Sequence, residues 1–157
     1  MTKWNMPPVA KIYEALGAVA DGRVKRTGEM TAEVLSSERD KTYTVKWSGE
    51  RSITSNDNAT RWQGYIGYPI IAVLLQTGQI PYDHSIAAAL GGVPWHGLNA
   101  EFKRDYDVAI KHVLAGLAER GVDAETVRRE AERIFGLLAE LQLERPEPKQ
   151  SRSKKDG

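Results

Sequence analysis

Residues 30–55, MTAEVLSSERDKTYTVKWSGERSITS, decide the fold of this chain. Apolar and polar residues alternate along this stretch, and the apolar ones include several β-branched and aromatic side chains, as is typical of strands with one buried face. Turn-forming residues interrupt the alternation twice, which indicates two chain reversals. The pattern predicts a three-stranded antiparallel meander.

The pairing of these strands follows from the requirement that one face of the sheet be apolar. A four-residue loop in the first hairpin sets Val34 opposite Tyr43 and keeps the apolar residues together. In the second hairpin, a two-residue loop would set Ile53 on the polar face, whereas a three-residue loop over 48–50 sets it opposite Val45. We therefore predict the three-residue loop.

Segments with helical periodicity flank the meander on both sides. An apolar stripe predicts an N-terminal helix over 7–20 that covers the inner face of the sheet. Residues 69–76 are apolar on nearly every side, which predicts a buried central helix. A helix over 99–120 and a following helix capped by Asp123 predict a C-terminal antiparallel pair, because the connection between them is short. The expected fold class is α+β.

The length and composition of the chain indicate one globular domain. It has 157 residues, of which 41% are hydrophobic and 27% charged, and a core of this size is held by packing alone. Apolar residues stop after Leu143, and the remainder is rich in Lys, Arg, Ser and Pro. We predict a single domain over 1–143 and a disordered basic tail over 144–157.

Composition also excludes several classes of function. The sequence has no cysteine, which rules out disulfides, thiolate metal sites and cysteine nucleophiles. Lys and Arg number 22 against 21 Asp and Glu, so no global field favours nucleic acid or an anionic membrane. The N-terminus lacks the features of a secretory signal, and the apolar run over 68–75 is too short to span a membrane. We expect a cytoplasmic location and no membrane partner.

Catalytic signatures are missing from the sequence. No segment matches a phosphate-binding loop, a dinucleotide fingerprint or the turn that carries a serine nucleophile. The three histidines have no metal-ligand spacing. We therefore predict no catalytic residue, no metal site and no cofactor.

One candidate binding group combines basic side chains with aromatic rings near the second hairpin. Its members are Lys46, Arg51, Arg61 and Trp62. Single-stranded nucleic acids are bound by this chemistry, because bases stack on aromatic rings while Lys and Arg contact phosphates. Ordinary surface charges beside core tryptophans are the alternative interpretation.

A second candidate group is rich in tyrosine and histidine. Its members are Tyr65, Tyr68, Asp83, His84 and His96. Such residues supply the polar groups of an aromatic cleft between a sheet and helices, although Asp83 is better explained as a helix cap.

The expected function is therefore that of a non-catalytic binding or assembly module that contacts nucleic acid or a protein partner. The alternative is a small enzyme or ligand-binding protein that uses the aromatic-histidine cleft. Association into a homo-oligomer through the C-terminal helices is a further expectation.

Overall fold

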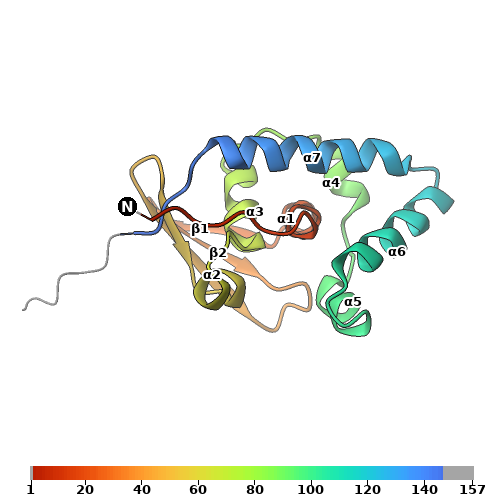
Figure 1. Cartoon of the computed structure of the whole chain (residues 1–157), viewed down its shortest axis with the longest axis horizontal. Coiled ribbons are helices and arrows are strands. Elements are labelled where there is room, and N and C mark those ends of the chain that lie inside the picture. The colour runs from red at the N-terminus through yellow and green to blue at the C-terminus, as the bar shows by residue number, and fades with distance from the viewer. Residues whose placement is uncertain (1, 147–157) are drawn as a thin grey trace, which may run out of the picture.

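The computed structural model describes residues 2–146 and consists of a four-stranded antiparallel sheet and seven helices (Figure 1). The α+β class is confirmed, with one strand more than predicted. In chain order the elements are α1 (Ala10–Ala20), β1 (Val24–Gly28), β2 (Thr31–Leu35), β3 (Thr42–Ser48), β4 (Ser52–Ser55), α2 (Asn58–Gln63), α3 (Tyr68–Gln76), α4 (His84–Ala89), α5 (Trp95–Glu101), α6 (Tyr106–Glu119) and α7 (Ala124–Glu140).

The additional strand, β1, forms one edge of the sheet and pairs with β2. Its only apolar residue is Val24, which is half-buried, and the rest of the strand is exposed. A strand of this kind has no alternating pattern, and its charged Lys25 and Arg26 are typical of edges that avoid further pairing. This is why the periodicity of the sequence did not predict it.

The first predicted register is confirmed and the second is wrong by two residues. Val34 lies opposite Tyr43 in the pairing of β2 with β3. In the pairing of β3 with β4, Ile53 lies opposite Trp47 and not opposite Val45. The loop has three residues as predicted but begins one residue later. Because the error is an even number of residues, Ile53 still faces the core and is only 3% exposed.

Three layers make up the body of the molecule. The central helix α3 lies directly against the sheet, and all its residues from Pro69 to Leu75 are buried, as predicted. The N-terminal helix α1, which was expected to cover the sheet, packs against α3 and so lies one layer further out (Figure 1). It begins at Ala10 and not at Pro7, because a residue that precedes a proline is disfavoured in helical conformation.

The predicted helix over 99–120 is in fact two helices, α5 and α6. Lys103 and Arg104 between them have positive φ angles of 54° and 65°, which no α-helix contains. The Asp105 carboxylate accepts a hydrogen bond of 3.3 Å from the N–H of Val108 and so starts α6. Asn99, expected to be the cap, lies inside α5.

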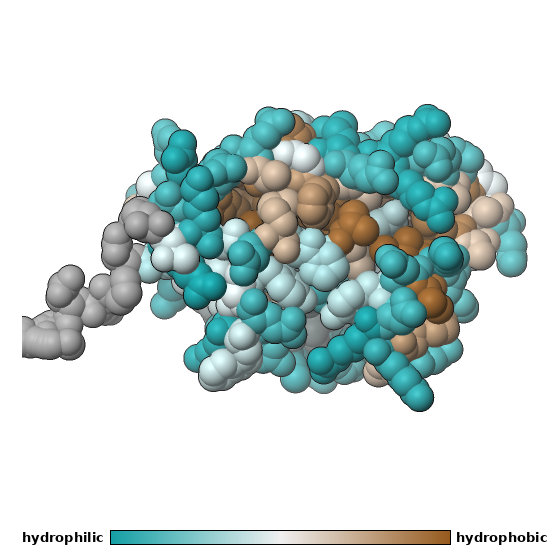
Figure 2. All heavy atoms as spheres, viewed as in Figure 1, coloured by the Kyte–Doolittle hydropathy of each residue, from teal (hydrophilic) through white to brown (hydrophobic). Residues whose placement is uncertain are grey.

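The C-terminal helices α6 and α7 pack against each other and against α1. Asp123 caps α7 as predicted, accepting a hydrogen bond of 3.0 Å from the N–H of Thr126. Apolar side chains gather in a band below α7 on the face shown in Figure 2. The stripe of α7 itself, including Ala131 and Ile134, is buried within the monomer. Association through these helices stays a prediction.

The two ends of the described chain meet at the free edge of β4. The N–H of Glu144 donates to the carbonyl of Arg51 at 2.8 Å, and the N–H of Trp4 donates to the carbonyl of Leu143 at 3.0 Å. Glu144 was assigned to the tail from the sequence, yet it is bonded to the sheet. Arg145, also assigned to the tail, donates its N–H to the carbonyl of Thr2 at 2.8 Å, and the part of the predicted tail from residue 147 lies outside the described residues.

Between residues 2 and 146, none of the helices combines the length and the apolar character that crossing a membrane requires.

Candidate functional site

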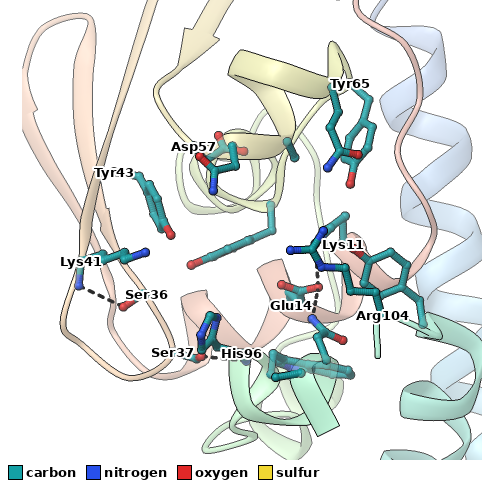
Figure 3. Close-up of a pocket in the computed structure, with 18 of the residues that line it drawn as sticks. Lys11, Glu14, Ser36, Ser37, Lys41, Tyr43, Asp57, Tyr65, His96 and Arg104 are labelled. Carbon is teal, nitrogen blue, oxygen red and sulfur yellow. Dashed lines mark hydrogen bonds and ion pairs between the residues drawn. The ribbon is translucent and has the colours of Figure 1, made fainter. Parts of the chain in front are cut away.

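A cavity of about 250 Å³ opens between the β2–β3 hairpin, α2 and α5 (Figure 3). The helix α1 supplies Lys11 and Glu14 to its lining, and the hairpin supplies Lys41 and Tyr43. Segments that are far apart in the sequence therefore meet around one polar space. Its lining contains more polar than apolar groups, which distinguishes it from a gap in the core.

A buried ion pair lies at the α1 side of the cavity. Lys11 and Glu14 are three residues apart and so share one face of the helix, with Nζ 3.2 Å from Oε2. Their side chains are only 11% and 7% exposed. Lys11 also lies 4.9 Å from the ring centroid of Tyr106, and Asn99 Nδ2 donates to Glu14 Oε2 at 3.3 Å. Burial is the largest influence and alone would lower the pKa of Lys11, but the charge and hydrogen bond of Glu14 together with Tyr106 and Tyr65 outweigh it, so the pKa lies above its ordinary value.

Positive charge predominates in the lining. Four cationic residues face two acidic ones, Glu14 and Asp57. The cationic residues are Lys11, Arg23, Lys41 and Arg104. Glu14 is paired with Lys11, and Asp57 caps α2 by accepting hydrogen bonds from the backbone and hydroxyl of Thr60 at 3.1 and 2.9 Å. Lys41 and Arg104 form no ion pair with the residues that the structure describes, whereas Arg23 is paired with Asp21, which lies outside the lining.

Arg23 lies just before β1 and is bonded to the last residue of β2. It is only 3% exposed, and its Nη1 donates to the carbonyl of Leu35 at 2.8 Å. Its Nε lies 3.5 Å from Asp21 Oδ2 but makes no hydrogen bond to any described residue. A guanidinium has five N–H donors, so Arg23 retains donors for a ligand.

Tyrosines supply neutral hydroxyls and an aromatic wall. The rings of Tyr43 and Tyr68 meet edge to face with centroids 6.1 Å apart. Burial raises the pKa of Tyr43, Tyr65 and Tyr68, and for Tyr68 the shift is large. These phenols remain protonated at neutral pH, so they can donate and accept hydrogen bonds but cannot act as bases.

The helix α5 closes the opposite side. The backbone N–H of His96 donates to Ser37 Oγ at 3.2 Å, which ties α5 to the hairpin. Trp95 is buried behind it, and its indole N–H has no hydrogen-bond partner within residues 2–146. Figure 3 shows His96 and Ser37 together at this side, with Lys41 and Ser36 along the hairpin.

The structure brings together part of the predicted aromatic-histidine group. Tyr65, Tyr68 and His96 line the cavity. Asp83 is instead the cap of α4 and accepts a hydrogen bond from the N–H of Ser85 at 2.9 Å. His84 stacks on the ring of Tyr82 with centroids 4.4 Å apart. Asp83 and His84 therefore do not belong to the lining of the cavity. In the part of the chain that the structure describes, no cluster of three or more metal-ligating side chains is found.

The predicted basic-aromatic group is spread over three elements. Lys46 is exposed on β3 opposite Thr54, and Arg51 lines a second cavity of about 170 Å³ beside the β3–β4 hairpin. Arg61 and Trp62 are neighbours on α2, with the guanidinium 5.7 Å from the ring centroid. Contact of all four residues with nucleic acid stays a prediction.

Sequence reasoning missed most of the charged residues of the cavity, including Lys11, Glu14, Arg23, Lys41 and Arg104. One signal was present in α1, where AKIYEALGAVA contains only two charged residues, three positions apart in an otherwise apolar and small-residue helix. Opposite charges at this spacing can pair with each other, and pairing is the condition under which charged side chains are buried. The other three residues lie in turns and loops, where cations are common on any surface.

Comparison with known proteins gives one result. No curated protein and no solved structure matches the chain significantly. A family model does match, over residues 4–144, and this range contains every element of the fold and the whole lining of the cavity. The chain belongs to the family described as uncharacterised conserved protein UCP014422.

Proposed function

We propose that this protein binds a small anionic ligand in the cavity between the β2–β3 hairpin, α2 and α5. The observation that carries the proposal is the excess of cations in the lining, where Lys41 and Arg104 have no ion-pair partner among the described residues and Arg23 is paired only with Asp21 outside the lining. Hydrogen bonds between cations and anions are stronger than neutral ones, and a partly enclosed site strengthens them further.

The neutral groups around these cations support a binding role. Phenol and amide side chains such as Tyr65, Tyr68 and Asn99 can bond to hydroxyl or carbonyl oxygens of a ligand. The raised pKa of Tyr65 and Tyr68 keeps both phenols protonated, which favours recognition over proton abstraction. We further propose a cytoplasmic location, which the absence of cysteine from the sequence supports.

Calorimetric titration with inorganic phosphate, pyrophosphate and citrate tests the proposal. Lys41→Gln and Arg104→Gln each remove one cation of the lining, and both side chains are exposed, so the fold is retained. Lys111→Gln is the matched control, because Lys111 is an exposed cation on α6 outside the lining.

At least one of the three anions should bind, and each cavity substitution should weaken that binding about tenfold, as expected for one lost charge-assisted hydrogen bond. Lys111→Gln should leave the affinity unchanged. If none of the anions binds, or if all three variants behave alike, the proposal is wrong.

A further inference from the structure

Trp62 is an unusual residue for a protein surface. It is 75% exposed, the most of any large hydrophobic residue in the described part of the chain. The guanidinium of Arg61 lies over its ring, 5.7 Å from the centroid. Since a cation covers one face at most, the other face is free for a planar group. An exposed tryptophan of this kind is typical of a contact surface.

The helix that carries Trp62 is fixed against the body of the molecule. Thr60, on the opposite side of α2, is 1% exposed and is bonded to the Asp57 carboxylate and to the N–H of Gly67. Gly64 ends the helix in the left-handed conformation, with φ of 74°. The ring of Trp62 is therefore carried by a helix that is fixed to the rest of the protein.

Trp62 lies on α2 next to residues that line the cavity. Asn58, Ala59 and Gln63 of the same helix line the cavity. With about 100° between successive residues of an α-helix, position 62 falls between positions 58 and 59 in projection. Trp62 is not itself part of the lining, but residues three and four apart are neighbours on a helix surface, so it adjoins Asn58 and Ala59, which are.

The cavity is too small to enclose a drug-sized ligand completely. Its volume of about 250 Å³ lies below the roughly 300–1000 Å³ of sites that enclose a drug-sized ligand. An anionic group can occupy the interior while another part of the ligand reaches Trp62. Aromatic rings bind nucleobases by stacking, whatever their sequence.

From these observations we infer that the ligand is a nucleotide, with its phosphate among the cations of the cavity and its base stacked on Trp62. This inference rests on the proposed function, because it needs the cavity to bind an anion. A free mononucleotide and the phosphorylated end of a nucleic-acid strand present the same chemistry. Both are therefore compared in the test.

The experiment titrates the full chain with four probes: inorganic phosphate, ribose 5-phosphate, adenosine 5′-monophosphate and a short 5′-phosphorylated oligonucleotide. The variants are Trp62→Ala and Trp62→Phe. Met30→Ala is the matched control, because Met30 is another exposed large hydrophobic residue, 45% exposed in the turn between β1 and β2 and outside the cavity lining.

Adenosine 5′-monophosphate should bind about tenfold or more tightly than ribose 5-phosphate, the gain expected from one stacked base. Trp62→Ala should remove this difference without changing the affinity for ribose 5-phosphate, whereas Trp62→Phe should keep most of it. Met30→Ala should change neither affinity. Tighter binding of the oligonucleotide than of the mononucleotide would identify a strand end as the source, and equal or weaker binding a free nucleotide.

The inference is overturned if the base adds no affinity, or if Trp62→Ala weakens the binding of ribose 5-phosphate and of adenosine 5′-monophosphate equally. In either case ribose 5-phosphate still binds, and the proposed anion site stands. If no phosphate binds at all, the proposed function fails together with the inference.

Discussion

Gly67 packs against the carboxylate of Asp57, which caps α2. Replacement of Gly67 by alanine tests this contact. A Cβ at position 67 would lie 2.8 Å from Asp57 Cγ and 2.9 Å from Oδ1, and closer still to Oδ2. The backbone of Gly67 has φ of −81° and ψ of 167°, which alanine adopts freely. The expected penalty of Gly67→Ala is therefore purely steric.

The magnitude follows from the bonds that the displaced carboxylate would lose. Asp57 accepts hydrogen bonds from the N–H and the hydroxyl of Thr60, and both residues are buried. Loss of a helix cap costs about 0.5–2 kcal/mol, and a buried polar group left without a partner costs about 1–3 kcal/mol. We expect Gly67→Ala to lower the free energy of unfolding by about 2–4 kcal/mol, which for a typical urea dependence moves the midpoint by about 1–2 M.

Urea unfolding followed by circular dichroism and tryptophan fluorescence measures this change. Gly136→Ala is the control, because Gly136 lies inside α7 and a Cβ there would meet nothing within 4 Å. Its substitution should raise the free energy of unfolding by about 0.5–1 kcal/mol, since alanine favours a helix over glycine. The two alanine substitutions should therefore change the free energy of unfolding in opposite directions.

A double-mutant cycle identifies the cause. In an Asp57→Ala background the carboxylate is gone, so Gly67→Ala should add far less destabilisation than it does alone. A loss below about 1 kcal/mol for Gly67→Ala, or a double variant whose loss equals the sum of the single losses, would refute the reasoning.

Three further predictions concern polar groups that are buried or partly buried. Trp95→Phe should lower the free energy of unfolding by about 1–2 kcal/mol, because the indole N–H has no hydrogen-bond partner among residues 2–146 to lose. This is less than the roughly 3–5 kcal/mol that truncation of a buried tryptophan to alanine costs. A larger loss in urea unfolding would contradict the prediction. Trp4→Phe removes a hydrogen bond of 2.7 Å to a backbone carbonyl of β4 and should cost about 1–2 kcal/mol, measured by thermal unfolding, and an unchanged midpoint would show that the bond contributes nothing. Burial alone would raise the pKa of Glu130, but hydrogen bonds from Arg133 and from the backbone N–H of Asp83 hold it below its ordinary value. The stabilisation is therefore present above the pKa of an unfolded glutamate and is lost as the pH falls through the lower folded value, so Glu130→Gln should flatten the acid side of the stability profile.

Local patterns in the sequence were sufficient for much of the fold. The alternation in residues 30–55 determined the pairing of Val34 with Tyr43, because only that register puts the apolar residues on one face. The uniformly apolar run after Pro69 determined a buried central helix, and Asp83 and Asp123 marked helix starts by their capping chemistry. In each case the deciding interaction joins residues that are close along the chain or repeat with a fixed period.

Features that depend on more distant contacts were not predictable in this way. The second hairpin admits two registers with the same apolar face, and the choice places Trp47 opposite Ile53. The break before α6 requires two residues with positive φ, which no periodicity reveals.

The candidate site shows the same division between sequence and tertiary structure. The sequence by itself determined that the chain is an α+β protein without thiol chemistry, and it marked Tyr65, Tyr68 and His96 as residues of interest. Only the tertiary structure decided that cations from α1, from the segment after it, from the β2–β3 hairpin and from the turn before α6 line one cavity. Because these cations are far apart along the chain, no local sequence pattern connects them. They can bind one ligand together only because packing of the helices on the sheet encloses them in the same cavity.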